Sequence, residues 1–189
     1  MRCRMLSKKE IALAEEERDL VRSLDIPISP EESLAEAKRR IGREHYTVRR
    51  RPGITRHGWT FTMTLRRSVW LHRGFERLDA FNQAAILWHE LVHVHQRAAM
   101  GDERFELYYL IPLKRWALEV PAYRMTIRAA ERMSDGNFDA KTYIDAKLAS
   151  FRSRYQMTAI PFSQFVKETS RIWAMDSRPS SEGNTKSED

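Results

Sequence analysis

The sequence predicts a mainly helical α+β fold, in which a small antiparallel sheet packs on one long helix with further helices around it. Residues 59–65 (WTFTMTL) alternate between apolar side chains and threonine, which is the pattern of a half-buried strand. Residues 80–99 instead carry apolar side chains along one side of a helix and polar side chains along the other. A chain of 189 residues, 42% of them hydrophobic, is long enough for one domain with a substantial core.

Two helices are predicted before the strands. Residues 7–23 have helical periodicity, and a proline-bounded break follows them. Ser29 then caps a second helix, because Pro30 suits the first helical position and Glu32 completes an S-x-x-E capping box. This second helix should end near Gly42.

Further strands are predicted on either side of residues 59–65. The run 46–48 (YTV) is rich in β-prone residues, and Pro-Gly at 52–53 indicates a turn. Residues 68–71 (SVWL) predict one more strand. We therefore expect an antiparallel sheet of two to four strands.

The long helix is predicted to run from Ala80 to Ala99, with Asp79 as its N-cap and Gly101 at its end. An aromatic-rich connection follows. Pro112 can then open a second long helix towards Met133. Pro121 lies inside that helix, where a proline should cause a kink or a restart.

After a turn at 134–137, two amphipathic helices are predicted over residues 139–155 and 161–175, and no apolar residue occurs from 177 onwards. We divide the chain into an N-terminal helical accessory segment (1–44), a core (45–133), C-terminal helices packed on the core (134–176) and a disordered tail (177–189).

The chain is basic, with a net charge of +7 and an isoelectric point near 9.7. Residues 38–40 (KRR) and 49–51 (RRR) form two clusters, which permit a nucleic-acid or other anionic partner. A solvated basic surface is the simpler interpretation, because no aromatic-interleaved nucleic-acid motif accompanies them. No apolar run approaches the ~18 residues of a membrane span, and we expect no membrane association. The single cysteine, Cys3, excludes an intramolecular disulfide, and the absence of a secretory signal favours a cytoplasmic protein.

The long helix contains an H-E-x-x-H motif as His89, Glu90 and His93. Residues four apart lie above one another on a helix, so both imidazoles can reach one metal ion. At about 100° per residue, Gln96 lies on the same side, where it should contact a ligand or the substrate, or simply lie at the surface. His95 points towards the apolar side and is excluded as a ligand.

A catalytic zinc ion commonly has two histidines and one carboxylate as ligands, with a fourth position left for water. Glu119 is the best candidate for the carboxylate. It lies in an apolar segment (WALEVPA, 116–122), where an unpaired buried acid would be costly, on a helix that can pack against the first. A salt bridge to Arg115 or Arg124 is the alternative explanation for Glu119.

Glu90 is expected to act as general base and not as a ligand. Zinc lowers the pKa of bound water from ~15.7 towards ~7, so a carboxylate beside it can take the proton and pass it to the leaving amine. Tyr123, one helical turn after Glu119, is the expected hydrogen-bond donor to the substrate carbonyl. Tyr108 and Tyr109 are alternatives for this role.

Together, the two motifs resemble the gluzincin type of zinc metallopeptidase. H-E-L-V-H-V-x-Q at 89–96 and E-V-P-A-Y at 119–123 are similar to small bacterial and phage-associated families with an H-E-L-x-H-V-x-Q helix and a downstream E-x-x-A-Y. A more distant similarity is to the repressor-cleaving metallopeptidases of mobile elements. The resemblance covers roughly residues 55–130. It implies a zincin-like core, with a short sheet, an active-site helix and a second helix that supplies Glu119 as a zinc ligand.

One position departs from the family pattern. Thermolysin-like gluzincins have an aspartate four residues after the ligand glutamate, which orients a histidine, whereas this chain has Tyr123 there. Another group must therefore orient the ligand histidines. Asp79, Asp102 or a backbone carbonyl is expected to do so.

These observations predict a zinc-dependent metallopeptidase that hydrolyses a peptide or protein substrate through metal-activated water. The alternative is a non-catalytic zincin-fold binding protein that contacts nucleic acid through residues 49–51. Glu90 beside a complete ligand set favours the enzyme, because a binding module needs no general base.

Overall fold

The computed structural model describes residues 29–50, 62–135, 137–139 and 142–143. The chain divides into two units, Met1–Ala140 and Lys141–Asp189, and the helices and strands whose bounds the structure defines lie in the first. Several predicted elements lie wholly or largely outside the described residues: the helices over 7–23, 139–155 and 161–175, the turn at 52–53, the first half of the strand at 59–65, and the tail from 177.

Helix α2 (Pro30–Arg43) begins as the capping box predicts. Ser29 Oγ accepts a hydrogen bond from the Glu32 backbone N–H at 3.3 Å, and the Glu32 carboxylate accepts one from the Ser29 N–H at 3.1 Å. Trp88 Nε1 donates to Ser33 Oγ at 2.9 Å, and this bond ties α2 to the next long helix. The buried residues of α2 recur every four positions: Ser33, Ala37 and Ile41.

Three short strands form a mixed sheet in the order β1-β3-β2: β1 (Thr47–Arg50), β2 (Met63–Leu65) and β3 (Ser68–Leu71). The strands β2 and β3 are an antiparallel pair, but β1 is parallel to β3. The prediction of a purely antiparallel sheet is therefore wrong. A parallel neighbour cannot be reached through a hairpin, so this pairing depends on a crossover that local sequence patterns do not encode.

The threonine side of β2 is its buried side. A half-buried strand usually buries its apolar side, whereas here Thr64 is buried and Met63 and Leu65 are only half-buried. Thr64 Oγ1 donates to Glu90 Oε2 on the adjacent helix at 2.8 Å. The buried hydroxyl thus has a polar partner, as buried polar groups require.

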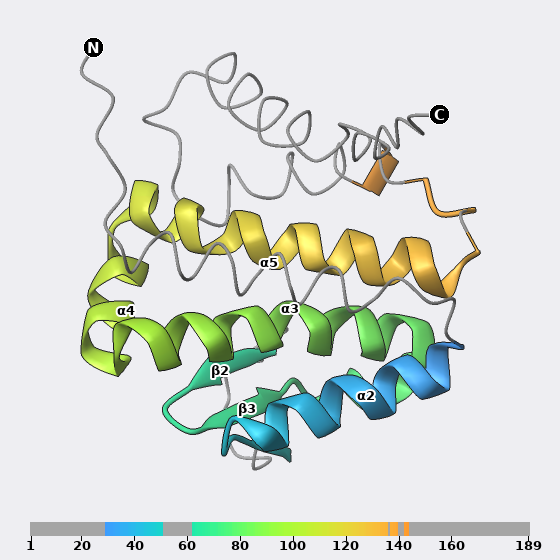
Figure 1. The fold of residues 1–189 in the computed structure, drawn as a ribbon, viewed down its shortest axis with the longest axis horizontal. Helices are drawn as coiled ribbons and strands as arrows, with labels where there is room; N and C mark the ends of the chain where they lie inside the picture. Colours follow the sequence, from blue (N-terminus) through green and yellow to red (C-terminus); the bar gives the residue numbers. More distant parts are fainter. Residues whose placement is uncertain (1–28, 51–61, 136, 140–141, 144–189) are drawn as a thin grey trace, which may run out of the picture. The chain divides into compact units, whose positions relative to one another are not determined.

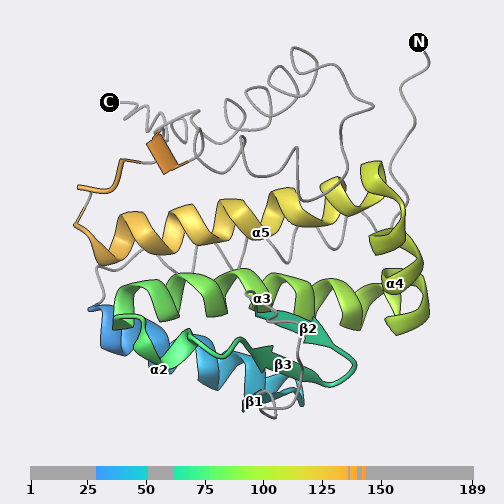
Figure 2. The same cartoon turned by 180° about the vertical axis from the view of Figure 1, so that it is seen from behind.

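Helix α3 (Ala80–Met100) confirms the predicted long helix and both of its ends. Asp79 accepts a hydrogen bond from the Asn82 N–H at 2.8 Å, and Gly101 ends the helix with a φ of 83°. Helix α3 lies between α5 on one side and α2 with the sheet on the other (Figures 1 and 2). Its buried side chains join the core cluster, which consists of Ala37, Ile41, Tyr46, Val69, Leu71, Phe75, Ala84, Leu87, Trp88, Leu91, Val92, Val94, Ala122, Met125 and Ala129.

After α3 come two helices, α4 (Asp102–Leu110) and α5 (Pro112–Met133). The sequence predicts only a connection where α4 lies. Its apolar side chains do not share one side, since Phe105 is buried while Leu107 and Leu110 are exposed, so the helical period is hard to recognise. Helix α5 confirms the second long helix and continues through Pro121 without a restart.

The fold class is thus confirmed as mainly helical α+β over the described residues. No helix among them is long and apolar enough to cross a membrane.

Candidate metal centre

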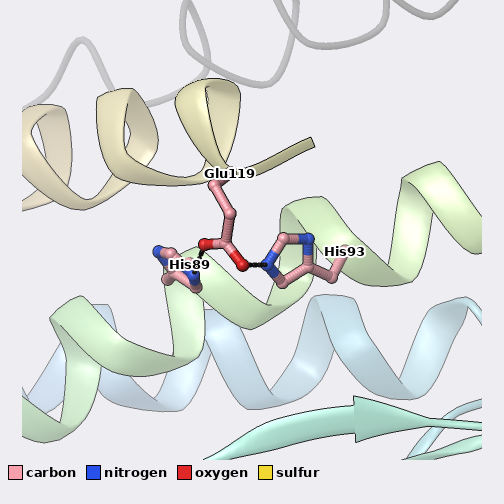
Figure 3. A group of neighbouring side chains, drawn as sticks. All are labelled: His89, His93 and Glu119. Carbon is pink, nitrogen blue, oxygen red and sulfur yellow. Dashed lines mark ion pairs between the residues drawn. The ribbon is translucent and has the colours of Figure 1, made fainter. Parts of the chain in front are cut away.

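The structure brings His89, His93 and Glu119 together between α3 and α5 (Figure 3). His89 Nε2 lies 3.3 Å from Glu119 Oε2, and His93 Nε2 lies 3.8 Å from Glu119 Oε1. The two histidines are one helical turn apart on α3, and the glutamate points down from α5 between their rings.

This arrangement fits a zinc ion. At bond lengths of ~2.0–2.2 Å, two donor atoms on one tetrahedral zinc lie roughly 3.4 Å apart. The observed separations of 3.3 and 3.8 Å, which end on the two different oxygens of Glu119, are close to that value. One donor atom from each of the three residues lies within 4.8 Å of the others. Two imidazoles and a carboxylate also form one of the standard donor sets of catalytic zinc.

The buried Glu119 carboxylate requires a compensating positive charge, which a protonated histidine or a metal ion would supply. Only 1% of the residue is exposed, and its Oε2 atom is buried without a hydrogen bond. A buried carboxylate oxygen of this kind is costly unless a positive charge compensates it. Arg115, one of the two arginines considered as its partner, donates its Nε–H to the backbone carbonyl of Tyr109.

The pKa values follow from this burial and pairing. Burial lowers the pKa of His93, but hydrogen bonding to Glu119 and the charges of Glu119 and Glu90 outweigh it and raise the pKa of His93 to about 9. Burial raises the pKa of the Glu119 carboxyl, but the adjacent His89 and His93 imidazoles hold it below its usual range. Without a metal, a protonated His93 thus serves as the cation of the site.

A threonine on α5 orients His89. Thr126 Oγ1 donates to the carbonyl oxygen of Ala122 at 3.0 Å and lies 3.4 Å from His89 Nδ1. Since the only hydroxyl proton is used on Ala122, Thr126 can only accept from His89 Nδ1. In the neutral imidazole, His89 Nε2 is then the nitrogen without a proton, and it faces Glu119.

A glutamine on α3 contacts His93. Gln96 Oε1 lies 2.9 Å from His93 Nδ1, and Gln96 Nε2 donates to the carbonyl oxygen of Leu118 at 2.9 Å. Asp79 caps α3, and Asp102 pairs with Arg97 at 2.6 Å. The expectation that Asp79 or Asp102 orients a ligand histidine is therefore wrong.

Sequence reasoning placed Gln96 on the metal side without choosing among its roles, and it missed Thr126. A usable signal existed for Thr126. It follows Glu119 by seven residues, and residues at that spacing share one side of a helix.

Glu90 follows His89 on α3 and is not part of the ligand group. Its carboxylate is buried, and its Oε2 accepts the hydrogen bond from Thr64 at 2.8 Å. Its charge contributes to the raised pKa of His93. His95, excluded from the predicted ligands, lies 4.0 Å from Glu44 and outside the group.

The three candidate tyrosines take different positions. Tyr109 donates its hydroxyl hydrogen bond to Glu119 Oε1 at 2.6 Å. The ring of Tyr123 meets the ring of His89 edge-on, with centroids 4.5 Å apart. The ring of Tyr108 lies under Lys114, 4.3 Å from the ammonium nitrogen. Tyr109 and Tyr123 therefore border the cluster from two elements.

The basic clusters are partly neutralised within the chain. Arg39 and Arg40 both bind the Glu36 carboxylate, each through Nε at 2.7 Å. Arg50 forms an ion pair with Glu76. These pairs reduce the positive charge that either cluster offers to an anionic partner.

Comparison of the chain with protein-family models, with curated proteins and with solved structures gives no match. The resemblance to gluzincins therefore stays a prediction that rests on the two motifs.

Proposed function

We propose that this protein is a zinc-dependent metallopeptidase of the gluzincin type, with His89, His93 and Glu119 as zinc ligands and Glu90 as general base. One observation carries the proposal. Two helices that are separate in sequence bring two imidazoles and a buried carboxylate to zinc-ligand spacing, beside a second buried carboxylate.

A bound zinc would polarise the substrate carbonyl and activate a water molecule. The chain's own part is to hold the base. Thr64 holds Glu90 through Oε2, and the Glu90 carboxylate would take a proton from the water and return it to the leaving amine. Because Glu90 is buried and hydrogen-bonded, it keeps its orientation without support from solvent.

A hydrogen-bond donor to the substrate carbonyl would come from a tyrosine. Tyr123 is the donor that the sequence predicts, and its ring borders the ring of His89. Tyr109 reaches Glu119 directly through its hydroxyl. Replacing each tyrosine by Phe distinguishes which of the two is the donor. Tyr123→Phe should lose turnover with zinc affinity retained if Tyr123 is the donor. Tyr109→Phe also removes a hydrogen bond to the ligand Glu119 and should weaken zinc binding, and Tyr108→Phe serves as the control.

The direct test is Glu90→Gln. Zinc affinity should remain, and hydrolysis of a fluorescent peptide library by the full chain should be lost, because the amide cannot take a proton. Hydrolysis that persists in this variant would refute Glu90 as base. Zinc affinity lost together with hydrolysis would show that Glu90 is a ligand.

The binding alternative rests on residues 49–51. Of these, Arg50 is paired with Glu76 and Arg49 donates to Thr47 Oγ1, whereas Arg51 lies outside the described residues. Contact with nucleic acid through these residues would weaken steeply as salt rises. Binding to DNA or RNA that resists salt would count against an arginine surface.

A further inference from the structure

We propose that Gln96 is a positioning residue of the metal site, which fixes the His93 ring with its proton on Nδ1 and ties this ligand to the α5 backbone beside Glu119. The inference rests on the proposed zinc site, but not on peptidase activity.

The orientation of the Gln96 amide follows from its partners. A backbone carbonyl only accepts hydrogen bonds, so the Gln96 atom 2.9 Å from Leu118 O must be the NH₂ group. The amide oxygen then faces His93 Nδ1 at 2.9 Å. An amide oxygen only accepts, and therefore His93 must donate from Nδ1.

This assignment determines which nitrogen can bind zinc. With the proton on Nδ1, the lone pair of the neutral imidazole is on Nε2. That atom lies 3.8 Å from Glu119 Oε1, on the side of the cluster. Gln96 thus selects the tautomer that the site requires, as hydrogen-bond partners of metal-binding histidines generally do.

The same amide connects the two helices that supply the ligands. Leu118, whose carbonyl it binds, is the residue before Glu119 on α5, and His93 is on α3. Gln96 is 1% exposed, so water does not replace either bond easily. Gln96 therefore joins the ligand His93 to the α5 backbone one residue before the ligand Glu119.

The test measures zinc affinity of the full chain by chelator competition. Gln96→Met keeps the length of the side chain and removes both hydrogen bonds, and it should weaken zinc binding about 10- to 100-fold. Gln96→Glu keeps the acceptor for His93 Nδ1 but loses the donor to the Leu118 carbonyl, so it should lose less zinc affinity than Gln96→Met. Gln83 is the matched control, because it lies on the same helix and donates to the Leu78 carbonyl at 2.7 Å, away from the cluster. Gln83→Met should leave zinc affinity unchanged.

A folded Gln96→Met variant with unchanged affinity would overturn the role, as would a Gln96→Glu variant that loses as much affinity as Gln96→Met. Nuclear magnetic resonance of the ¹⁵N-labelled, zinc-loaded original chain gives a second test that needs no variant. His93 should carry its proton on Nδ1 and bind zinc through Nε2, and the reverse assignment would refute the proposal. A chain that binds no zinc would refute both this role and the metal site. Zinc binding without hydrolysis would refute only the peptidase.

Discussion

The metal-free protein should lose stability as the pH rises from 6.5 to 9, which is the reverse of the effect of a paired carboxylate. The perturbed group is His93, whose pKa is raised from 6.5 to about 9 in the fold. A group with a raised pKa contributes stability that is complete below its unfolded pKa. This contribution is lost as the pH passes through the folded value. The window of loss is therefore pH 6.5 to about 9.

The magnitude follows from the two pKa values. Their difference of about 2.5, at 1.36 kcal/mol per pH unit, corresponds to about 3 kcal/mol of unfolding free energy. Small domains have about 5–15 kcal/mol in total, so the loss would be easy to measure. Zinc should abolish it, because His93 is neutral as a ligand at every pH in this range.

The assay is urea unfolding of the chelator-treated full chain at pH 6.5 and pH 9, with Glu119→Gln as the comparison. The variant lacks the carboxylate that raises the pKa of His93, so its stability should change much less over this range. Equal stability at the two pH values in the original chain would refute the reasoning. A Glu119→Gln variant that loses as much unfolding free energy between pH 6.5 and pH 9 as the original chain would also refute it.

Three substitutions test other contacts. Thr64→Val leaves the buried Glu90 carboxylate without its hydroxyl donor; it should destabilise the chain by about 1.5–3 kcal/mol and slow hydrolysis, whereas Thr64→Ser should preserve both. Full hydrolysis in Thr64→Val would show that this bond does not position the base. Ser33→Ala leaves the buried Trp88 N–H unpaired and should cost about 1–3 kcal/mol in urea unfolding, with an unchanged midpoint counting against the α2–α3 bond. Gly101→Ala should cost about 1–3 kcal/mol because the φ of 83° disfavours a side chain, although the added methyl group meets no atom within 4 Å. Unchanged thermal stability would show that the turn relaxes freely.

Features that depend on neighbouring residues could be predicted from the sequence. Ser29 and Asp79 begin their helices and Gly101 ends one, as expected, because caps are interactions within one turn. The side-by-side arrangement of His89 and His93 follows equally from helix geometry. Glu119 was found by chemical reasoning, since an acid in an apolar segment requires a partner.

Features that depend on distant chain segments could not be predicted in the same way. The parallel pairing of β1 with β3 is set by a crossover, and nothing in either strand specifies its direction. The sequence does not show which side of β2 is buried, because the hydrogen-bond partner of the buried Thr64 hydroxyl is Glu90, which lies on another element. The hydrogen-bond partners of the ligand histidines likewise come from packing, which brings Thr126 of α5 to His89.

X-ray absorption at the zinc edge of the loaded full chain tests the metal site most directly. The proposed site should bind one zinc ion with two imidazole ligands and oxygen donors at ~2.0–2.2 Å. His93→Ala should remove one imidazole or abolish binding, whereas His95→Ala, a histidine on the same helix outside the cluster, should leave the spectrum unchanged. A chain that binds no zinc, or a spectrum that His93→Ala leaves unaltered, would refute the zinc site at His89, His93 and Glu119.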